Sequence, residues 1–231
     1  MLGNLAHIGR AIGSPARAAM IYALFDGEPH SAGQLAGAAG VSSATASQHL
    51  AILSEAGVVT VRRQGRYRHY QLANSRIAHA LEQLSEPGLP TVTSLRLSRE
   101  QRRVRLARTC YDHLAGQLGV ALAQRMVAIE WITPPMSAVT PEGTKALADH
   151  FGLDVEASAR SRRPTIRPCR DWTEQRDHIA GTLGAMIATT LLDDAWVIRR
   201  PSSRALTITE HGAERLHAAG VDLVVGRDAQ T

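Results

Sequence analysis

The stretch SAGQLAGAAGVSSATASQHL, residues 31–50, predicts two short helices joined by a tight turn. Leu35 lies in the first helix, and Gly40 can adopt the positive φ that a tight interhelical turn needs. The hydroxyl of Ser42 can then cap the start of the second helix. Beyond this cap, apolar residues recur at helical spacing and predict one buried face, formed by Ala46, Leu50 and Leu53.

The opposite face of the second helix carries small, hydrogen-bonding side chains. No acidic residue interrupts this face before Glu55. A surface that meets base edges and phosphates needs such side chains, because a carboxylate would repel the nucleic-acid backbone. We therefore expect five residues of this helix to contact DNA: Ser43, Thr45, Ser47, Gln48 and His49.

A basic β-hairpin is predicted directly after the second helix. Residues 58–63 have the composition of a strand, Gln64-Gly65 forms a turn, and residues 66–72 return as the partner strand. Such a hairpin can reach phosphates or a minor groove beside the helix, whereas a merely solvated basic hairpin is the alternative. The residues expected to contact DNA are Arg62, Arg63, Gln64, Arg66 and Arg68.

This order of elements, with a helix before it and an amphipathic helix over 75–84 after it, resembles the ArsR/SmtB family of winged-helix repressors. The resemblance covers about residues 10–85 and is carried by Leu35-Ala36, Gly40-Val41-Ser42, Ser47-Gln48-His49-Leu50, residues 53–59 and residues 63–72. It implies a homodimer whose terminal helices pack together and present two recognition helices to an inverted repeat in double-stranded DNA. It also implies repression that an effector relieves, often a metal ion.

An apolar stripe on the last of these helices is expected to form the dimer together with the N-terminal helix. Its residues are Ile77, Leu81 and Leu84, which would otherwise be exposed on a small domain.

The metal sites of that family are not carried over to this sequence. Residues 30–35 contain no thiol where arsenic and lead sensors carry cysteines, and His79 lacks the paired acid and histidine ligands of zinc-sensing members. A lone histidine on such a helix is more often a packing residue than a ligand. We therefore predict no metal site and no cofactor.

The composition is that of a globular protein that can bind a polyanion. Of 231 residues, 44% are hydrophobic and 20% are charged, and the formal net charge is +5. Lys145 is the only lysine, so the basic residues are almost all arginines, and their clustering indicates a nucleic-acid partner. No apolar run approaches the roughly 20 residues that span a bilayer, and the first residues do not resemble a signal peptide. A cytoplasmic protein without membrane contact is expected.

Two domains are expected from this length. Pro and Gly gather at residues 86–90 and predict a linker over 86–98, between a DNA-binding and dimerisation domain over 1–85 and a second domain over 99–226. The second domain starts with a helical segment whose arginines form either another basic patch or a solvated face: Arg99, Arg102, Arg103, Arg105 and Arg108.

The second domain contains a self-similarity at an offset of 65 residues. DHLAGQLG at 112–119 aligns with DHIAGTLG at 177–184, and Trp131 aligns with Trp196. Such a period indicates a duplicated supersecondary unit, with copies over about 105–155 and 167–223. We expect each copy to contain a long helix, a tryptophan, a hairpin-like segment and a short helix, like a degenerate winged helix. The predicted fold class is mainly α with small β-hairpins.

Both cysteines lie in these copies. Cys110 and His113 are three residues apart on a predicted helix and would share a face, a spacing that can hold a metal ion or activate a thiol. Cysteine with histidine and aspartate is also the minimal set for a nucleophile, but no glycine-rich oxyanion loop accompanies it. Buried packing ranks first among the interpretations, an effector-sensing thiol second, a metal ligand third and a catalytic thiol last.

The sequence therefore predicts a sequence-specific DNA-binding transcriptional regulator and no enzyme. The specific hypothesis is a dimeric repressor released by a small-molecule, thiol-reactive or metal effector. Its effector region is expected where the two copies meet, lined by Cys110, Tyr111, His113, Cys169, Trp172 and His178. The alternatives are a thiol-dependent enzyme fused to a DNA-binding domain and an architectural DNA protein without a ligand.

Overall fold

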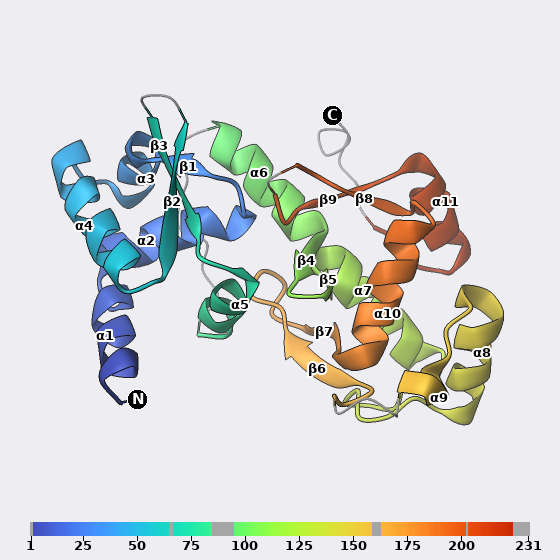
Figure 1. Ribbon diagram of the computed structural model, residues 1–231. Helices are drawn as coiled ribbons and strands as arrows, with labels where there is room; N and C mark the ends of the chain where they lie inside the picture. Colours follow the sequence, from blue (N-terminus) through green and yellow to red (C-terminus); the bar gives the residue numbers. More distant parts are fainter. Residues whose placement is uncertain (1, 65–66, 85–94, 159–162, 202, 224–231) are drawn as a thin grey trace. The chain divides into compact units, whose positions relative to one another are not determined.

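The computed structural model describes residues 2–64, 67–84, 95–158, 163–201 and 203–223 (Figure 1). They divide into two compact units. The N-terminal unit runs to Glu100 and takes in Arg204, and the C-terminal unit begins at Gln101. Most of the linker expected over 86–98 lies outside the described residues, and its last part, from Leu95, belongs to a helix. The predicted fold class, mainly α with small antiparallel hairpins, is confirmed.

The N-terminal unit contains helices around a small sheet. Its elements are α1 (Leu2–Ile12), α2 (Pro15–Ala23), the 3₁₀ turn η1 (Leu24–Asp26), β1 (His30–Ser31), α3 (Ala32–Ala39), α4 (Ser43–Glu55), β2 (Val59–Gln64), β3 (Tyr67–Leu72) and α5 (Ser75–Gln83).

The predicted pair of helices at 31–50 is confirmed, together with the signals that start and end them. The side chain of Ser31 accepts a hydrogen bond from the Gln34 N–H and begins α3 with a capping box. Gly40 ends α3 at φ 63°, and Ser42 caps α4 by accepting from the Thr45 N–H at 3.2 Å. The tight turn between α3 and α4 therefore rests on a glycine and a serine cap.

The predicted hairpin is also confirmed, as part of a three-stranded antiparallel sheet in the order β1-β3-β2. Its register runs from Val59 opposite Leu72 to Gln64 opposite Tyr67, and the turn at residues 65–66 lies outside the described residues. The core of the unit is formed by side chains that are fully buried, among them Met20, Leu24, Leu35, Ala46, Leu50 and Leu53.

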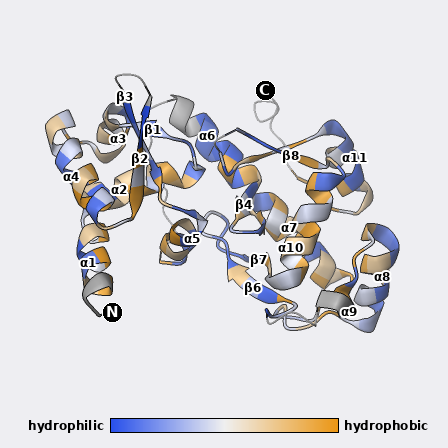
Figure 2. Cartoon of the chain, viewed as in Figure 1, coloured by the Kyte–Doolittle hydropathy of each residue, from blue (hydrophilic) through white to orange (hydrophobic). Residues whose placement is uncertain are grey.

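The C-terminal unit is entered through α6 (Leu95–Leu106), a hydrophilic helix that contrasts with the more hydrophobic α7 and α10 (Figure 2). Its other elements are β4 (Arg108–Cys110), β5 (His113–Ala115), α7 (Gly116–Ala128), α8 (Pro141–Phe151), α9 (Val155–Ser158), β6 (Arg167–Arg170), β7 (Asp177–Ala180), α10 (Gly181–Asp193), β8 (Val197–Arg199), β9 (Leu206–Ile208) and α11 (Glu210–Ala218).

The prediction that the two Asp-His segments begin long helices is wrong. Residues 113–115 and 177–180 are strands, each paired in a short antiparallel hairpin, β4–β5 and β6–β7. Each helix starts only at the following glycine, because Gly116 and Gly181 have φ 76° and 89°, which a continuous right-handed helix cannot contain. Cys110 therefore lies opposite His113 on paired strands rather than on one helix face.

The two similar segments have the same order of elements and use their shared residues in the same contacts. Thr140 caps α8 by accepting from Gly143 N–H at 2.9 Å, and Thr209 caps α11 by accepting from Gly212 N–H at 2.8 Å. The second segment contains the expected hairpin β8–β9, where the first has an isolated bridge between Ile132 and Val139. That the segments arose by duplication stays a prediction.

Helices α7 and α10 each pack against the hairpin of the other segment. A Cβ at Gly119 of α7 would lie 3.4 Å from the Cβ of His178, and one at Gly184 of α10 would lie 3.1 Å from the Cβ of His113. Both glycines also lie against the backbone of their own hairpin, at Leu114 and Ile179. Gly119 and Gly184 therefore allow α7 and α10 to approach the strands of both hairpins closely.

Candidate functional site

Helix α4 presents the polar face that the sequence predicts. Ser43, Ser47 and Gln48 are exposed, and Thr45 and His49 are half-buried, while Ala46, Leu50 and Leu53 on the other side are completely buried. The helix is thus held by its apolar face and leaves five hydrogen-bonding side chains outward. Their contact with DNA stays a prediction.

The hairpin β2–β3 carries exposed arginines on both strands. Arg62, Arg63 and Arg68 are exposed, and Arg63 lies directly opposite Arg68 in the register. Like charges in directly opposed positions destabilise a hairpin, so the pair costs stability unless an anion lies between or beside them. Arg66 and the side chain of Gln64 lie outside the described residues.

A basic residue that the sequence analysis missed lies next to this face. The Arg17 Nη1 of α2 is 3.3 Å from Nδ1 of His49, and Arg17 also donates to the carbonyl of Arg10 at 2.8 Å. Because a guanidinium can only donate, Nδ1 of His49 is the acceptor and Nε2 carries the proton. The signal in the sequence was a single arginine within an otherwise apolar helix.

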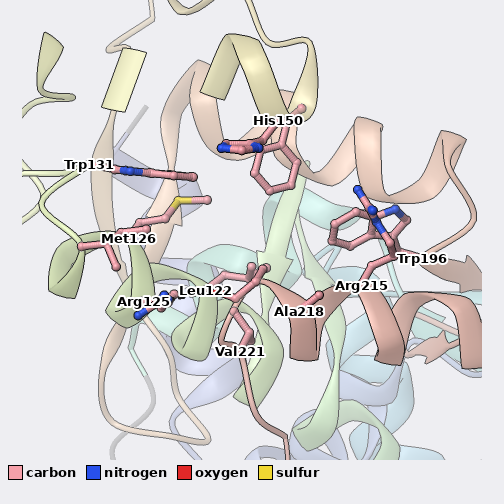
Figure 3. A pocket seen from close by; sticks show the side chains of 12 residues that line it. Leu122, Arg125, Met126, Trp131, His150, Trp196, Arg215, Ala218 and Val221 are labelled. Atoms are coloured by element: carbon pink, nitrogen blue, oxygen red, sulfur yellow. Dashed lines mark hydrogen bonds between the residues drawn. The ribbon is translucent and has the colours of Figure 1, made fainter. Parts of the chain in front are cut away.

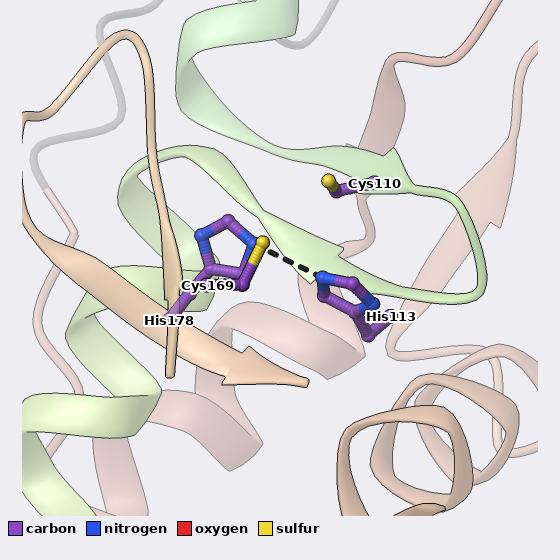
Figure 4. A group of neighbouring side chains, drawn as sticks. All are labelled: Cys110, His113, Cys169 and His178. Atoms are coloured by element: carbon purple, nitrogen blue, oxygen red, sulfur yellow. Dashed lines mark hydrogen bonds between the residues drawn. The ribbon is translucent and has the colours of Figure 1, made fainter. Parts of the chain in front are cut away.

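The C-terminal unit contains a buried cluster of Cys110, His113, Cys169 and His178 (Figure 4). Each offers one ligand atom, and these four atoms all lie within 4.8 Å of one another. One cysteine and one histidine come from hairpin β4–β5, and the other two come from β6–β7, where Cys169 lies opposite His178. All four are at most 3% exposed.

Four of the six residues expected to line the effector region are thus brought together, and two are not in the cluster. Tyr111 is 50% exposed in the turn between β4 and β5, at φ 61°. Trp172 is buried, with its ring 5.1 Å from the guanidinium carbon of Arg108.

Each cluster histidine faces the other histidine with one ring nitrogen and faces a carboxylate with its second ring nitrogen. Their Nε2 atoms are 3.1 Å apart. Nδ1 of His113 lies 3.2 Å from the Asp112 carboxylate, and Nδ1 of His178 lies 3.2 Å from the Asp171 carboxylate. Both rings are therefore oriented by an acid and point Nε2 toward the centre of the cluster.

Asp171 is the most strongly held of these groups. It pairs with the completely buried Arg108 at 3.0 Å and accepts from the Gly116 N–H at 2.7 Å. Burial opposes the charged form of Asp171, but His178 and Arg108 outweigh that effect and hold the pKa of the carboxyl far below its usual range. Arg108 is therefore a buried structural cation, and the expectation that it belongs to an exposed arginine face is wrong, because it lies in β4 beyond the end of α6.

Asp112 also forms an ion pair with an arginine. Arg163 donates to Asp112 at 2.6 Å. Burial opposes the charge of Asp112, but Arg163 and His113 lower the pKa of this carboxyl. For His178, burial opposes protonation, but Asp171 and Cys110 raise the pKa of the imidazole. Each histidine of the cluster thus faces a carboxylate whose charge an arginine already balances.

A separate cavity of about 330 Å³ lies in the same unit, between the two aligned tryptophans Trp131 and Trp196 (Figure 3). His150 is stacked on Trp131 at 5.9 Å between ring centroids, and Arg215 lies over Trp196 at 5.2 Å. The cavity was not predicted from the sequence, although the alignment of the two tryptophans is a signal that points to it.

The fold and the α4 face define a winged-helix protein of the DNA-binding class, and comparison with known proteins gives its family. A family model described as a helix-turn-helix domain matches residues 12–62. A protein of Bacillus subtilis named as the uncharacterized HTH-type transcriptional regulator YdfF is 38% identical over 212 residues, which cover 90% of this chain and 93% of YdfF. The chain therefore belongs to the HTH-type transcriptional regulators.

Shorter matches involve a regulator named CmtR. CmtR of Mycobacterium tuberculosis is 40% identical over 80 residues, which cover 35% of this chain and 67% of CmtR. A solved structure of the cadmium metal-sensor CmtR from the same organism is 36% identical to this chain. That match covers 39% of this chain and 92% of the CmtR chain, with a TM-score of 0.32.

Among the described residues, no helix is long and apolar enough to cross a membrane.

Proposed function

We propose that this transcriptional regulator is a cytoplasmic, dimeric repressor that binds an inverted repeat in double-stranded DNA and is released by an effector. The observation that carries the proposal is the polar, acid-free face of α4 next to the arginines of β2–β3. Base edges are read by hydrogen-bonding side chains, and phosphates are bound by arginines. One sheet and one helix of the same unit supply both kinds of contact.

Dimerisation is supported by large apolar side chains that the protomer leaves exposed. Leu5 of α1 is 71% exposed, and Leu84 at the end of α5 is 72% exposed. Leu81, expected on the same interface, is only 8% exposed within one chain. The interface is therefore proposed around Leu5 and Leu84, with Leu81 serving the core of the protomer.

Catalysis by a thiol is not part of the proposal. Cys110 and Cys169 are 1% and 3% exposed, whereas a nucleophilic thiol must reach its substrate. The matched relatives are transcriptional regulators.

The DNA contact is tested with Arg63→Ala combined with Arg68→Ala. Each phosphate contact contributes about 0.9 to the slope of log affinity against log salt, so loss of two contacts is expected to reduce the slope by about 1.8. Binding should weaken for every duplex, measured by fluorescence anisotropy on a sequence selected from random duplexes by the wild type. Gln48→Ala should instead change the preferred bases, by about 1–3 kcal/mol at the pair it reads.

The matched control is Arg199→Ala, an exposed arginine on the hairpin strand β8 of the other unit. It should leave both affinity and slope unchanged. Equal binding of selected and random duplexes at moderate salt would contradict the proposal.

The dimer is tested with Leu5→Glu combined with Leu84→Glu. A carboxylate at each exposed apolar position should cost little in the monomer but should oppose burial in an interface, so sedimentation is expected to show monomers with much weaker DNA binding. Ile198→Glu is the control, because Ile198 is 47% exposed but belongs to the C-terminal unit. A dimer that survives the double change would exclude this interface.

A further inference from the structure

We propose that Cys110, His113, Cys169 and His178 bind one thiophilic metal ion of the Zn²⁺ class in tetrahedral geometry, and that this ion joins hairpins β4–β5 and β6–β7. Two thiolates and two imidazoles form a donor set that is typical of structural zinc sites. All four ligands belong to the C-terminal unit, and the existence of this site does not depend on the repressor proposal.

The spacing of the donors suits such an ion. Zn–S bonds of about 2.3 Å and Zn–N bonds of about 2.0 Å place the ligand atoms of a tetrahedral site about 3.3–3.8 Å apart. The four ligand atoms here already lie within 4.8 Å of one another, so a contraction of about 1 Å completes the site. The donors stand on paired strands, which hold each cysteine opposite a histidine.

The orientation of the histidines gives an independent reason for a cation between them. An ionised carboxylate only accepts hydrogen bonds, so Asp112 and Asp171 favour the proton on the Nδ1 of each ring. Both Nε2 atoms then carry lone pairs, 3.1 Å apart in a buried site. A metal ion accepts both lone pairs at once. The pairing of a ligating histidine with a carboxylate is the usual outer shell of a protein metal site.

The two carboxylates beside the cluster histidines are already paired with arginines. Arg163 pairs with Asp112 and Arg108 pairs with Asp171, so neither carboxylate needs a further cation. Two thiolates would bring two negative charges into the buried cluster, and a divalent ion neutralises them. A disulfide between the two cysteines would remove those charges, but it would leave the two Nε2 atoms facing each other.

The test uses the full chain, reduced and stripped of metal with a chelator, and then titrated with Co²⁺ or Zn²⁺. We expect one ion per chain after gel filtration, and a Co²⁺ spectrum with tetrahedral ligand-field bands and sulfur charge-transfer bands. Zn²⁺ should also protect both thiols from a colorimetric thiol reagent in native protein. An octahedral spectrum, or failure of the reduced wild type to retain any ion, would overturn the proposal.

Variants assign the ligands. Cys110→Ser, Cys169→Ser, His113→Asn and His178→Asn are each expected to weaken Co²⁺ binding by more than about 100-fold, since the loss of an outer-shell partner alone costs 10–100-fold. His217→Asn, an exposed histidine at 82% side-chain accessibility, should bind like the wild type. Undiminished binding in the variant with both cysteines replaced would also overturn the proposal.

Two aspartates offer a matched pair that does not disturb the core. Asp112 and Asp177 each precede a cluster histidine, but Asp112 contacts His113, whereas Asp177 pairs with the exposed Arg170 at 3.8 Å. Asp112→Asn should therefore weaken Co²⁺ binding about 10–100-fold, and Asp177→Asn should leave it unchanged. Equal effects of the two changes would contradict the outer-shell role of Asp112.

Discussion

Replacing Arg108 with methionine is expected to destabilise the C-terminal unit by about 3–5 kcal/mol. Methionine keeps most of the side-chain volume but removes the cation that pairs with Asp171 at 3.0 Å in a completely buried position. The carboxylate would then be left with an uncompensated charge. All three tryptophans belong to this unit, so urea unfolding followed by tryptophan fluorescence measures its stability.

The matched control is the ion pair Arg105–Glu174, at 2.8 Å, in which Arg105 is half-exposed and Glu174 is 16% exposed. Arg105→Met should cost less than about 1 kcal/mol, because surface ion pairs contribute little. Combining Arg108→Met with Asp171→Asn should cost less than the sum of the single changes, since each removes the partner of the other. If Arg108→Met and Arg105→Met lowered the free energy of unfolding equally, the buried ion pair would contribute no more to stability than the other pair.

Gly212→Ala is expected to cost about 3 kcal/mol or more, at the upper end of what overpacking costs. A Cβ at Gly212 would lie 1.9 Å from the carbonyl oxygen of Trp196, which is backbone and cannot turn aside. The methyl group would push α11 away from the backbone at residues 195–196. The hydroxyl of Thr209, which caps α11, accepts from the Gly212 N–H and donates to the carbonyl of Ala195 in that segment. The same urea experiment reports the change through Trp196.

Gly143→Ala should behave alike, because its Cβ would lie 2.2 Å from the Trp131 carbonyl. Glu214→Ala, at an exposed position of α11, should stay within about 0.5 kcal/mol of the wild type. If Gly212→Ala left the free energy of unfolding unchanged, α11 would not be closely packed against the Trp196 backbone.

The N-terminal unit was predictable because its signals are local. Gly40, the cap at Ser42 and the strand composition on either side of the hairpin turn each act within a few residues of where they stand. Turn, cap and periodicity then agree with one another, which is what makes a sequence specify one local structure. The part of Leu81 in a dimer stays a prediction, because periodicity shows which residues share a face, but not which neighbour covers that face.

The C-terminal unit was harder because its strands are very short. Three residues such as His113–Ala115 are too few to show an alternating pattern, and the adjoining helical period extended the predicted helix backward across Gly116. The glycine itself was visible, but its positive φ was not. Arg108 was misplaced for the same reason, since it follows the end of a helix whose boundary the sequence leaves open.

The cysteine–histidine cluster depends on contacts between residues far apart in the chain. The sequence predicted that one cysteine and one histidine of each copy lie where the two copies meet, but it could not show how Cys169 and His178 would reach the other pair. Only the pairing of strands, and the glycines that let α7 and α10 approach the opposite histidines, bring four donors together. The cavity between Trp131 and Trp196 is equally non-local.

The origin of the cluster in two hairpins also has a consequence for the synthesis of the protein. His178 is added 65 residues after His113, which takes about 3–13 s at about 5–20 residues per second. During that interval the nascent chain holds Cys110 without the hairpin that later buries it. The Cys110 thiol is therefore most accessible to oxidants during translation, and the rate of translation sets how long it stays accessible.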